Sequence, residues 1–264
     1  MTVIHINNLN EIQTTCTVGS NEEYYIGIPD HEIVAVDKQY VSNKPNIYCL
    51  KEGSKMYNAR IKMTDCNTMN IVDSEGNEQF MCIKKDRDRV IIYNKDNTPI
   101  LNTFVNDDFK KMYIYKGENE TEKLVTIETS SQITNDIQKC RIHFHNIASN
   151  ENEELEMRYS KSTLCNYIYC NKGKANETII GAIKVDNRLK NECTVEISPM
   201  VDTMLLLSLS TVVVNFLTVK NDIKKKKEFY LDFCSCCCLI LIFLTLLLML
   251  LLLIILIKSF NTMN

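Results

Sequence analysis

The stretch Thr203–Val219 reads Thr-Met-Leu-Leu-Leu-Ser-Leu-Ser-Thr-Val-Val-Val-Asn-Phe-Leu-Thr-Val and carries no charge. Pro199 and Asp202 precede it, as a helix breaker and an N-cap residue do. Apolar side chains lie all round this helix, so it has to be buried on every side, in a protein interior or in a bilayer. Its polar residues weigh against the bilayer. They are Ser208, Ser210, Thr211 and Asn215. We therefore expect a helix at about 202–219 enclosed by the domain, with an additional membrane span over 203–219 as the alternative.

A second apolar stretch, Phe233–Ile257, contains no charge and follows Lys224–Lys227, while Lys258 closes it. At about 1.5 Å of rise per residue it covers roughly 37 Å, enough to cross a hydrocarbon core of about 30 Å. We expect a basic juxtamembrane linker over 221–232, a transmembrane helix over 233–257 and a short tail over 258–264. The lysines before the span predict a single-pass protein whose N-terminal domain lies in the cytosol.

Two groups next to the predicted span are candidate membrane contacts. Lys224, Lys225, Lys226 and Lys227 can attract anionic lipid, at roughly 1 kcal/mol each near the surface, or they serve only as a topology signal. The candidates for S-acylation at the mouth of the span are Cys234, Cys236, Cys237 and Cys238. The alternative is that these cysteines are small hydrophobic residues that start the helix.

Composition restricts the remaining possibilities. The net charge of −3, with basic and acidic residues interleaved, argues against a nucleic-acid partner. Residues 1–22 are polar and lack periodicity, so we expect a loose leader without a secretory signal. The other cysteines show no pairing rhythm and predict reduced, buried thiols of a cytosolic domain. They stand at positions 16, 49, 66, 82, 140, 165, 170 and 193.

Short β-like runs separated by polar turns follow each other from about residue 23 to residue 195. Their spacing of about 10 to 15 residues favours an antiparallel meander or barrel over βαβ units. Because the chain has only seven glycines, Asn and Asp are expected to fill many left-handed turn positions. The predicted strands include Tyr24–Ile28, Glu32–Val36, Asn46–Leu50, Met112–Tyr115, Lys123–Ile127, Cys140–His145, Thr178–Ile183 and Cys193–Ile197.

Two neighbouring segments repeat one pattern of strand, polar turn and strand. Asn70–Phe80 contains Asp-Ser-Glu-Gly-Asn at its centre, and Arg89–Leu101 contains Asn-Lys-Asp-Asn-Thr. Two adjacent hairpins are the economical interpretation.

These hairpins, Val72–Asn77 and Tyr93–Leu101, resemble the two Asp-x-x-Gly-Asn hairpins of the LURP-one-related family, with Asp96 at the second glycine position. That family shares the Tubby-like C-terminal fold with phospholipid scramblases. The resemblance covers about residues 30–219 and implies a domain over 23–220, a mainly β, Tubby-like antiparallel barrel of about twelve strands around a central hydrophobic helix. Other segments match in family order: Ile33–Val41 resembles the opening strand, Asn46–Glu52 the next, and Gly181–Lys184 with Thr194–Asp202 the last strands and the helix entry.

Tubby-like domains resemble phosphoinositide-binding modules, which hold a head group with basic residues on the barrel. The densest basic cluster here is Lys84, Lys85, Arg87 and Arg89. Asp86 and Asp88 alternate with it and cancel much of its field, so a solvated hairpin is expected. No lipid-binding residue of the family is carried over, because no motif matches position by position.

The scramblase resemblance implies a calcium site before the hydrophobic helix. That interval offers only Glu192, Glu196 and Asp202, whereas calcium takes six to eight oxygen ligands. Calcium-driven activity is therefore not expected.

His143 and His145, with Cys140 nearby, can share a face of a strand, but a zinc site needs a further ligand that the sequence does not designate. Two surface histidines are expected instead. Nucleophile elbows and phosphate-binding glycine loops are absent from the sequence. We expect a protein that is not an enzyme and needs no metal or cofactor.

Two functions remain. The first is a tail-anchored membrane protein that displays a Tubby-like barrel to the cytosol for interaction with a protein or with membrane lipids, anionic lipids and phosphoinositides included. The alternative is a scramblase-like lipid transporter in which residues 203–219 form an additional span.

Overall fold

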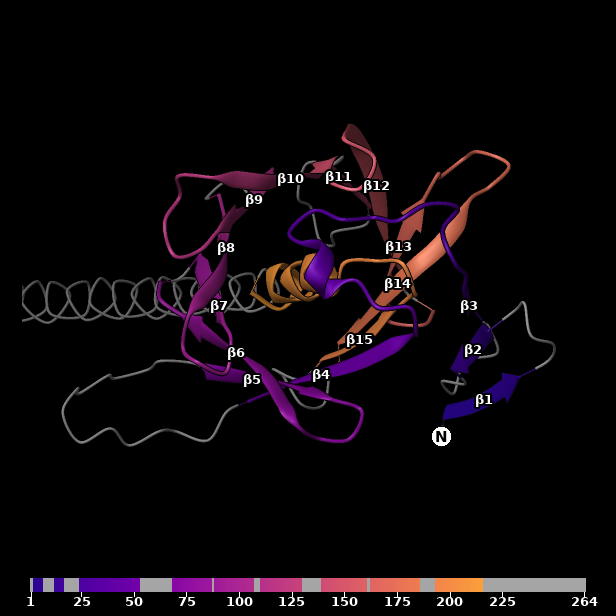
Figure 1. The fold of residues 1–264 in the computed structure, drawn as a ribbon, viewed down its shortest axis with the longest axis horizontal. Coiled ribbons are helices and arrows are strands. Elements are labelled where there is room, and N and C mark those ends of the chain that lie inside the picture. The colour runs from indigo at the N-terminus through magenta and orange to yellow at the C-terminus, as the bar shows by residue number, and fades with distance from the viewer. Residues whose placement is uncertain are drawn as a thin grey trace, which may run out of the picture. The chain divides into compact units, whose positions relative to one another are not determined.

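Twelve strands form a closed antiparallel barrel in the computed structural model, and each strand pairs with its neighbour in sequence (Figure 1). Pairing of the last strand with the first, with Cys193 opposite Leu50, closes the ring. The expected barrel of about twelve strands is thus confirmed. The structure describes residues 2–6, 12–16, 24–52, 68–86, 88–106, 110–129, 139–160, 162–185 and 193–215.

The barrel strands run in chain order from β4 to β15. They are β4 (Asn46–Glu52), β5 (Thr68–Asp73), β6 (Glu78–Lys84), β7 (Arg89–Tyr93), β8 (Pro99–Val105), β9 (Lys111–Lys116), β10 (Lys123–Thr129), β11 (Lys139–Asn146), β12 (Glu151–Ser160), β13 (Cys165–Cys170), β14 (Thr178–Val185) and β15 (Cys193–Ile197).

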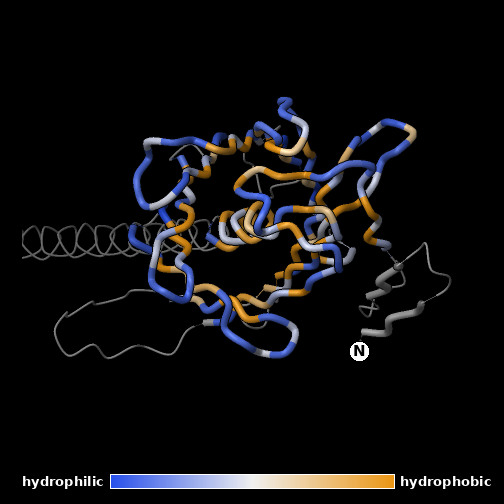
Figure 2. Tube along the Cα trace, viewed as in Figure 1, coloured by the Kyte–Doolittle hydropathy of each residue, from blue (hydrophilic) through white to orange (hydrophobic). Residues whose placement is uncertain are grey.

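Alternate residues of the strands point into the barrel, as a period of two requires. In β9 the inward residues are Met112 and Ile114, and in β10 they are Val125 and Ile127, each at most 1% exposed. Figure 2 shows hydrophobic residues alternating with hydrophilic ones along the strands. The inward residues are therefore mostly apolar.

Residues 203–215 are helical and occupy the centre of the ring (Figure 1). None of the thirteen side chains from Thr203 to Asn215 is more than 5% exposed. The helix predicted at about 202–219 lies inside the protein over its described part, and residues 216–219 fall outside that part. The ring of strands thus buries a helix that is apolar on all faces.

Three polar side chains of this helix bond to its own backbone, whereas the amide nitrogen and oxygen of Asn215 are buried without a hydrogen-bond partner in the described part of the chain. The hydroxyl oxygens of Ser208, Ser210 and Thr211 donate to the carbonyls three residues earlier at 2.6–2.8 Å. Thr103 Oγ1 of β8 also lies 3.4 Å from Thr211 Oγ1. Satisfied hydroxyls lose little on burial, so they are compatible with an apolar interior.

A small sheet of β1 (Thr2–Ile6), β2 (Ile12–Cys16) and β3 (Tyr25–Ile26) precedes the barrel in the chain. The expected loose leader over 1–22 therefore contains two strands. Both are rich in Thr and Ile, which favour extended backbone, and register pairing of Thr2 with Cys16 through Ile6 with Ile12 satisfies their amides.

The two predicted hairpins are present as β5–β6 and β7–β8, and their turns have matching hydrogen bonds. The Asp73 side chain accepts from the amides of Glu75 and Asn77, and the Asn94 side chain accepts from those of Asp96 and Thr98.

The match of the two turns corrects one detail of the resemblance to the family's hairpins, the residue that takes the second glycine position. Gly76 has φ 87° and Asn97 has φ 59°, so Asn97, not Asp96, stands at the second glycine position. Asparagine tolerates the left-handed region that this turn position requires. Asn150 and Asn171 also adopt positive φ, which confirms that asparagine replaces glycine at several turns.

Substitution of Gly76 by alanine is expected to cost about 1–2 kcal/mol of stability. A Cβ at this position meets nothing within 4 Å, so the cost is purely conformational. Gly76→Asn should cost less than about 1 kcal/mol, because asparagine tolerates positive φ. Denaturant unfolding of both variants measures the difference, with Ser74→Ala in the same exposed turn as control. Equal costs for alanine and asparagine would contradict this explanation.

The segment expected as a strand over Glu32–Val36, and as the family's opening strand over Ile33–Val41, is not a barrel strand. It forms two isolated bridges, Ile33 with Val201 and Val41 with Asp202, and a 3-10 turn, η1 (Lys38–Tyr40). Side chains elsewhere in the chain bind its amides, so these amides do not join the ladder.

Within the described ranges, no helix is both long enough and apolar enough to cross a membrane. The predicted linker over 221–232, span over 233–257 and tail over 258–264 lie outside those ranges.

Candidate functional site

Asp202 lies at the N-terminus of the central helix and is 0% exposed. Its Oδ2 accepts the amides of residues 35–37 at 2.7–3.3 Å. Its Oδ1 accepts those of Met204 and Leu205 at 2.9 and 3.4 Å, which confirms the predicted N-cap. One carboxylate thus caps the helix and also binds the segment that closes this end of the barrel. We call residues 32–37 the closing segment. Burial raises the pKa of Asp202, and its backbone donors act in the opposite direction.

Asn146, the last residue of β11, also binds the closing segment. Its Oδ1 accepts the amides of Val34 and Ala148 at 3.1 and 2.9 Å. Its Nδ2 donates to the Glu32 carbonyl and to Glu153 Oε1 at 2.8 and 2.7 Å. Sequence reasoning missed this residue, although the signal existed: Asn146 continues the inward positions 140, 142 and 144, where a polar residue needs partners.

A polar cleft of about 510 Å³ lies beside this segment, between the β11–β12 turn, β12 and the β13–β14 loop. Glutamates outnumber lysines along it, so its field is acidic. The lining residues are His31, Ser149, Glu151, Asn152, Glu153, Glu154, Leu155, Glu156, Cys170, Asn171, Lys172 and Lys174.

Part of the acidic charge is already paired. Glu156 lies 2.7 Å from Lys139 Nζ and also contacts Arg158. Lys172 pairs with Glu177 and lies over the ring of Tyr169 at 3.8 Å.

His31 connects the closing segment to the rim of the cleft. Its Nδ1 is 2.6 Å from Asp30 Oδ1, and its Nε2 is 3.0 Å from Glu153 Oε2. Partial burial lowers the pKa of His31, but the bonds to Glu153 and Asp30 outweigh burial, so the pKa lies above its ordinary value.

The His31 contacts should stabilise the fold more in acid than in base. Because the folded pKa is raised, the contribution is complete below about pH 6.5 and is lost as the pH rises through the folded pKa. The difference in unfolding free energy between wild type and His31→Gln should therefore shrink from about pH 6 to about pH 8. The trend should weaken in Glu153→Gln, which lacks one of the carboxylates. A difference that grows with pH would contradict the prediction.

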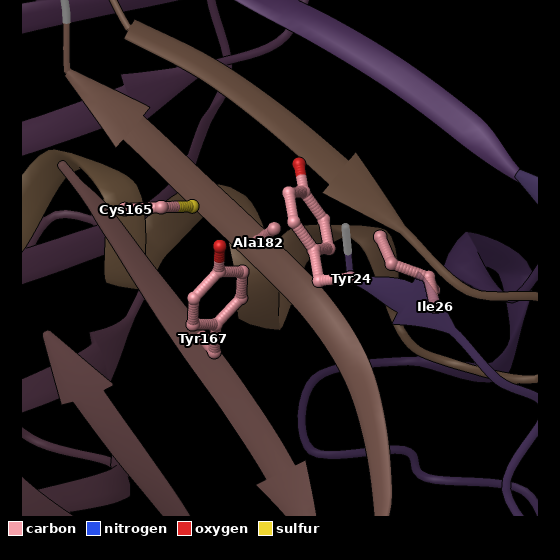
Figure 3. Close-up of a cluster of buried hydrophobic side chains, with 5 residues drawn as sticks. All are labelled: Tyr24, Ile26, Cys165, Tyr167 and Ala182. Carbon is pink, nitrogen blue, oxygen red and sulfur yellow. The ribbon is translucent and has the colours of Figure 1, made fainter. Parts of the chain in front are cut away.

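The outer face of β13–β15 carries an apolar patch that β3 covers (Figure 3). Tyr24 and Ile26 pack on Cys165, Tyr167 and Ala182. The rings of Tyr24 and Tyr167 are 4.7 Å apart at 60°. The patch is thus a compact surface outside the filled interior.

Glu196 of β15 lies at the edge of this patch. Its Oε1 accepts the Tyr24 hydroxyl at 3.2 Å. Its Oε2 is buried and has no hydrogen-bond partner within the described part of the chain. No sequence signal pointed to this residue, because an outward position between Val195 and Ile197 is normally solvated.

The basic cluster of the β6–β7 hairpin contacts the loop after β9. Lys85 Nζ is 3.6 Å from Glu118, and Arg89 donates to Asn102 and to the Glu118 carbonyl. Arg87 lies outside the described residues. Lys85 and Arg89 are therefore paired with groups of the β8 strand and of the loop after β9.

The structure separates the residues that a zinc site or a calcium site would need to bring together. Cys140 points into the barrel at 0% exposure, whereas His143 lies on the outer face with its ring nitrogen 3.4 Å from Glu154. Glu196 points outward and Asp202 inward, and Glu192 lies outside the described residues. Among the residues that the structure describes, no group of three or more His, Cys, Asp and Glu residues is arranged to hold a metal ion.

The described cysteines of the barrel are free, and all of these but the half-buried Cys49 are buried, as expected, while Cys66 lies outside the described residues. Burial raises the pKa of Cys140, Cys165 and Cys193 to about 12. Such thiols are poor nucleophiles at neutral pH. The lipidation candidates Cys234, Cys236, Cys237 and Cys238 and the lipid-contact candidates Lys224–Lys227 lie outside the described residues.

Comparison with known proteins gives a matching family and a similar solved structure. The model of the family described as LURP-one-related matches residues 57–214. An X-ray structure of a protein from Arabidopsis thaliana is similar, with 15% sequence identity and a TM-score of 0.48, over 70% of this chain and 98% of that chain. No curated protein matches the sequence.

Proposed function

The chain belongs to the LURP-one-related family, and from this premise we propose that it is a non-enzymatic, tail-anchored membrane protein whose barrel is a cytosolic protein-interaction module. The filled interior carries the proposal. Because residues 203–215 are at most 5% exposed, the central helix fills the middle of the described barrel, and we expect a partner to bind the outer surface.

The charges of the barrel favour a protein over an anionic lipid as its partner. The cleft is lined by four glutamates and two lysines, so an anionic head group would meet like charge there. Lysines or arginines of a protein segment would meet opposite charge. Instead, Lys224–Lys227 would contact anionic lipid, and the cysteines at 234 and 236–238 would be the sites of lipidation.

Two observations support a role without catalysis. Thiols with a pKa near 12 stay protonated at neutral pH, and the imidazole of His31 is engaged by two carboxylates. Neither arrangement activates a nucleophile.

Membrane attachment is tested by carbonate extraction of cells that express the full chain or a chain ending at residue 222. We expect the full chain to stay with the membranes and the shorter chain to be released with an unchanged unfolding midpoint. Lys224–Lys227→Ala serves as the control for purely electrostatic attachment and should remain in the membranes. Release of the full chain by carbonate would refute the anchor.

The lipid-transporter alternative requires residues 203–219 to cross the bilayer, so residues 220–230 and the barrel would lie on opposite sides. Burial of residues 203–215 by strands supports the first function. Protease digestion of intact vesicles should therefore cleave both regions from the same side. The reconstituted full chain should not accelerate exchange of a labelled lipid between leaflets above the rate in empty vesicles, and a protein-dependent acceleration would favour the transporter.

A further inference from the structure

Residues 24–28 lie across the outer face of β14 as a strap, whose residues Tyr25 and Ile26 also pair with Thr15 and Thr14 of β2. The Gly27 amide donates to the Ile179 carbonyl at 2.9 Å, and Ser198 Oγ donates to the Gly27 carbonyl at 2.6 Å. The chain that follows is bound far more firmly, since Asp202 accepts three amides of residues 35–37. The strap can therefore leave the surface while the closing segment stays in place.

The surface beneath the strap is better suited to a cation than to the tyrosine it holds. The Tyr24 hydroxyl supplies one donor to Glu196, and the second carboxylate oxygen is buried without a partner in the described structure. A buried carboxylate oxygen without a donor is costly. An arginine at this position can donate to both oxygens through its planar fork and stack on Tyr167, whose ring already lies 4.7 Å from that of Tyr24.

Two further positions of the strap set size limits. Ile26 is 6% exposed and fills the apolar patch. A Cβ at Gly27 would lie 2.7 Å from Thr178 Cγ2, so a residue larger than glycine fits only if the Thr178 side chain moves. Tyr25, between them, is 48% exposed.

We propose that the outer face of β13–β15 is an acceptor groove for an extended protein segment of the pattern Arg-x-aliphatic-Gly, and that Tyr24–Gly27 occupies it as an internal stand-in. The charge of Glu196 selects the arginine, the patch around Ala182 selects the aliphatic residue, and Thr178 selects the glycine. This groove is separate from the cleft and requires no membrane attachment.

The first test uses the full chain in detergent with its strap opened by Tyr24→Ala and Ile26→Asp. The probes are two fluorescent peptides of residues 20–30, one with Tyr24→Arg and one with Tyr25→Arg. They have the same composition and differ only in the order of arginine and tyrosine. Anisotropy titrations should show at least about tenfold tighter binding of the Tyr24→Arg peptide, as a charge-assisted pair provides. The unopened chain should bind it more weakly, because its own strap competes.

Glu196→Gln in the opened chain is the matched control, since it removes the charge and keeps the shape. It should reduce the preference between the two peptides to less than about threefold. Equal affinity of the two peptides for the opened chain, or a preference that survives Glu196→Gln, would overturn the proposal.

A second test does not depend on the folding of the opened variant. Tyr24→Arg in the otherwise unchanged full chain should raise the unfolding midpoint by about 2–4 °C, and Tyr25→Arg should not raise it. The gain should vanish in Glu196→Gln. A midpoint lowered equally with and without the Glu196 carboxylate would overturn the groove, while the carbonate extraction result would stand.

Discussion

Replacement of Asp202 by alanine should destabilise the barrel by about 3–5 kcal/mol, because five amides, three of them in buried hydrogen bonds, lose their acceptor at once. Three of these amides belong to residues 35–37 and two to the first turn of the central helix. A loss of this size is a large part of the 5–15 kcal/mol that stabilises typical domains. Denaturant unfolding of the full chain, followed by circular dichroism, measures it.

Two matched variants separate the capping bonds from the bonds to the closing segment. Asp202→Asn keeps an acceptor for the helix amides but places an NH₂ donor against the amides of residues 35–37, so it should still cost about 2–3 kcal/mol. Asp37→Ala removes an exposed carboxylate that accepts only from Gln39, and should cost less than about 1 kcal/mol. An Asp202→Ala variant no less stable than Asp37→Ala would show that the closing segment is held by other contacts.

Gly181→Val should destabilise the fold by about 3 kcal/mol, through a clash between the barrel wall and its central helix. A Cβ at Gly181 would lie 2.5 Å from Leu206 Cδ1 and 3.2 Å from the Glu196 carbonyl oxygen. Glycine is therefore required for close approach of β14 to the helix. Thermal and denaturant unfolding of the full chain would quantify the loss.

A double-mutant cycle tests whether Leu206 is the clashing partner. Leu206→Ala alone should cost about 2–5 kcal/mol as a cavity, but combined with Gly181→Val the total should fall short of the sum by at least about 1 kcal/mol. Leu205→Ala, a substitution of the same type at a position 0% exposed, should add to Gly181→Val without such coupling. Additive costs for both pairs would contradict direct contact as the cause.

Strands with alternating apolar residues could be predicted from the sequence, because every second side chain of such a strand faces the interior and is apolar. β9, β10, β11, β14 and β15 belong to this class. β12 was missed, since Glu-Asn-Glu-Glu-Leu-Glu-Met-Arg-Tyr-Ser has few apolar residues. It is a strand because β11 and β13 pair with it on both sides, and such pairing cannot be read from the strand itself.

The segment Ile33–Val36 gives the opposite case. Its β-branched, apolar residues predict a strand, yet its amides bind Asn146 and Asp202, more than 100 residues away. Local propensity was overridden by two side chains whose proximity depends on closure of the ring. The candidate groove could not be foreseen either, because an outward glutamate is normally solvated and only β3 buries it.

The sequence by itself determined that Thr203–Val219 and Phe233–Ile257 both need apolar surroundings, because neither offers a polar face to water. It also determined the two hairpins and most strand positions, which depend on local turn chemistry and alternation. Only the tertiary structure decided that residues 203–215 are enclosed by protein, because hydrophobicity is the same in a barrel and in a bilayer. A closed ring of twelve strands supplies that enclosure, and no single segment encodes a ring.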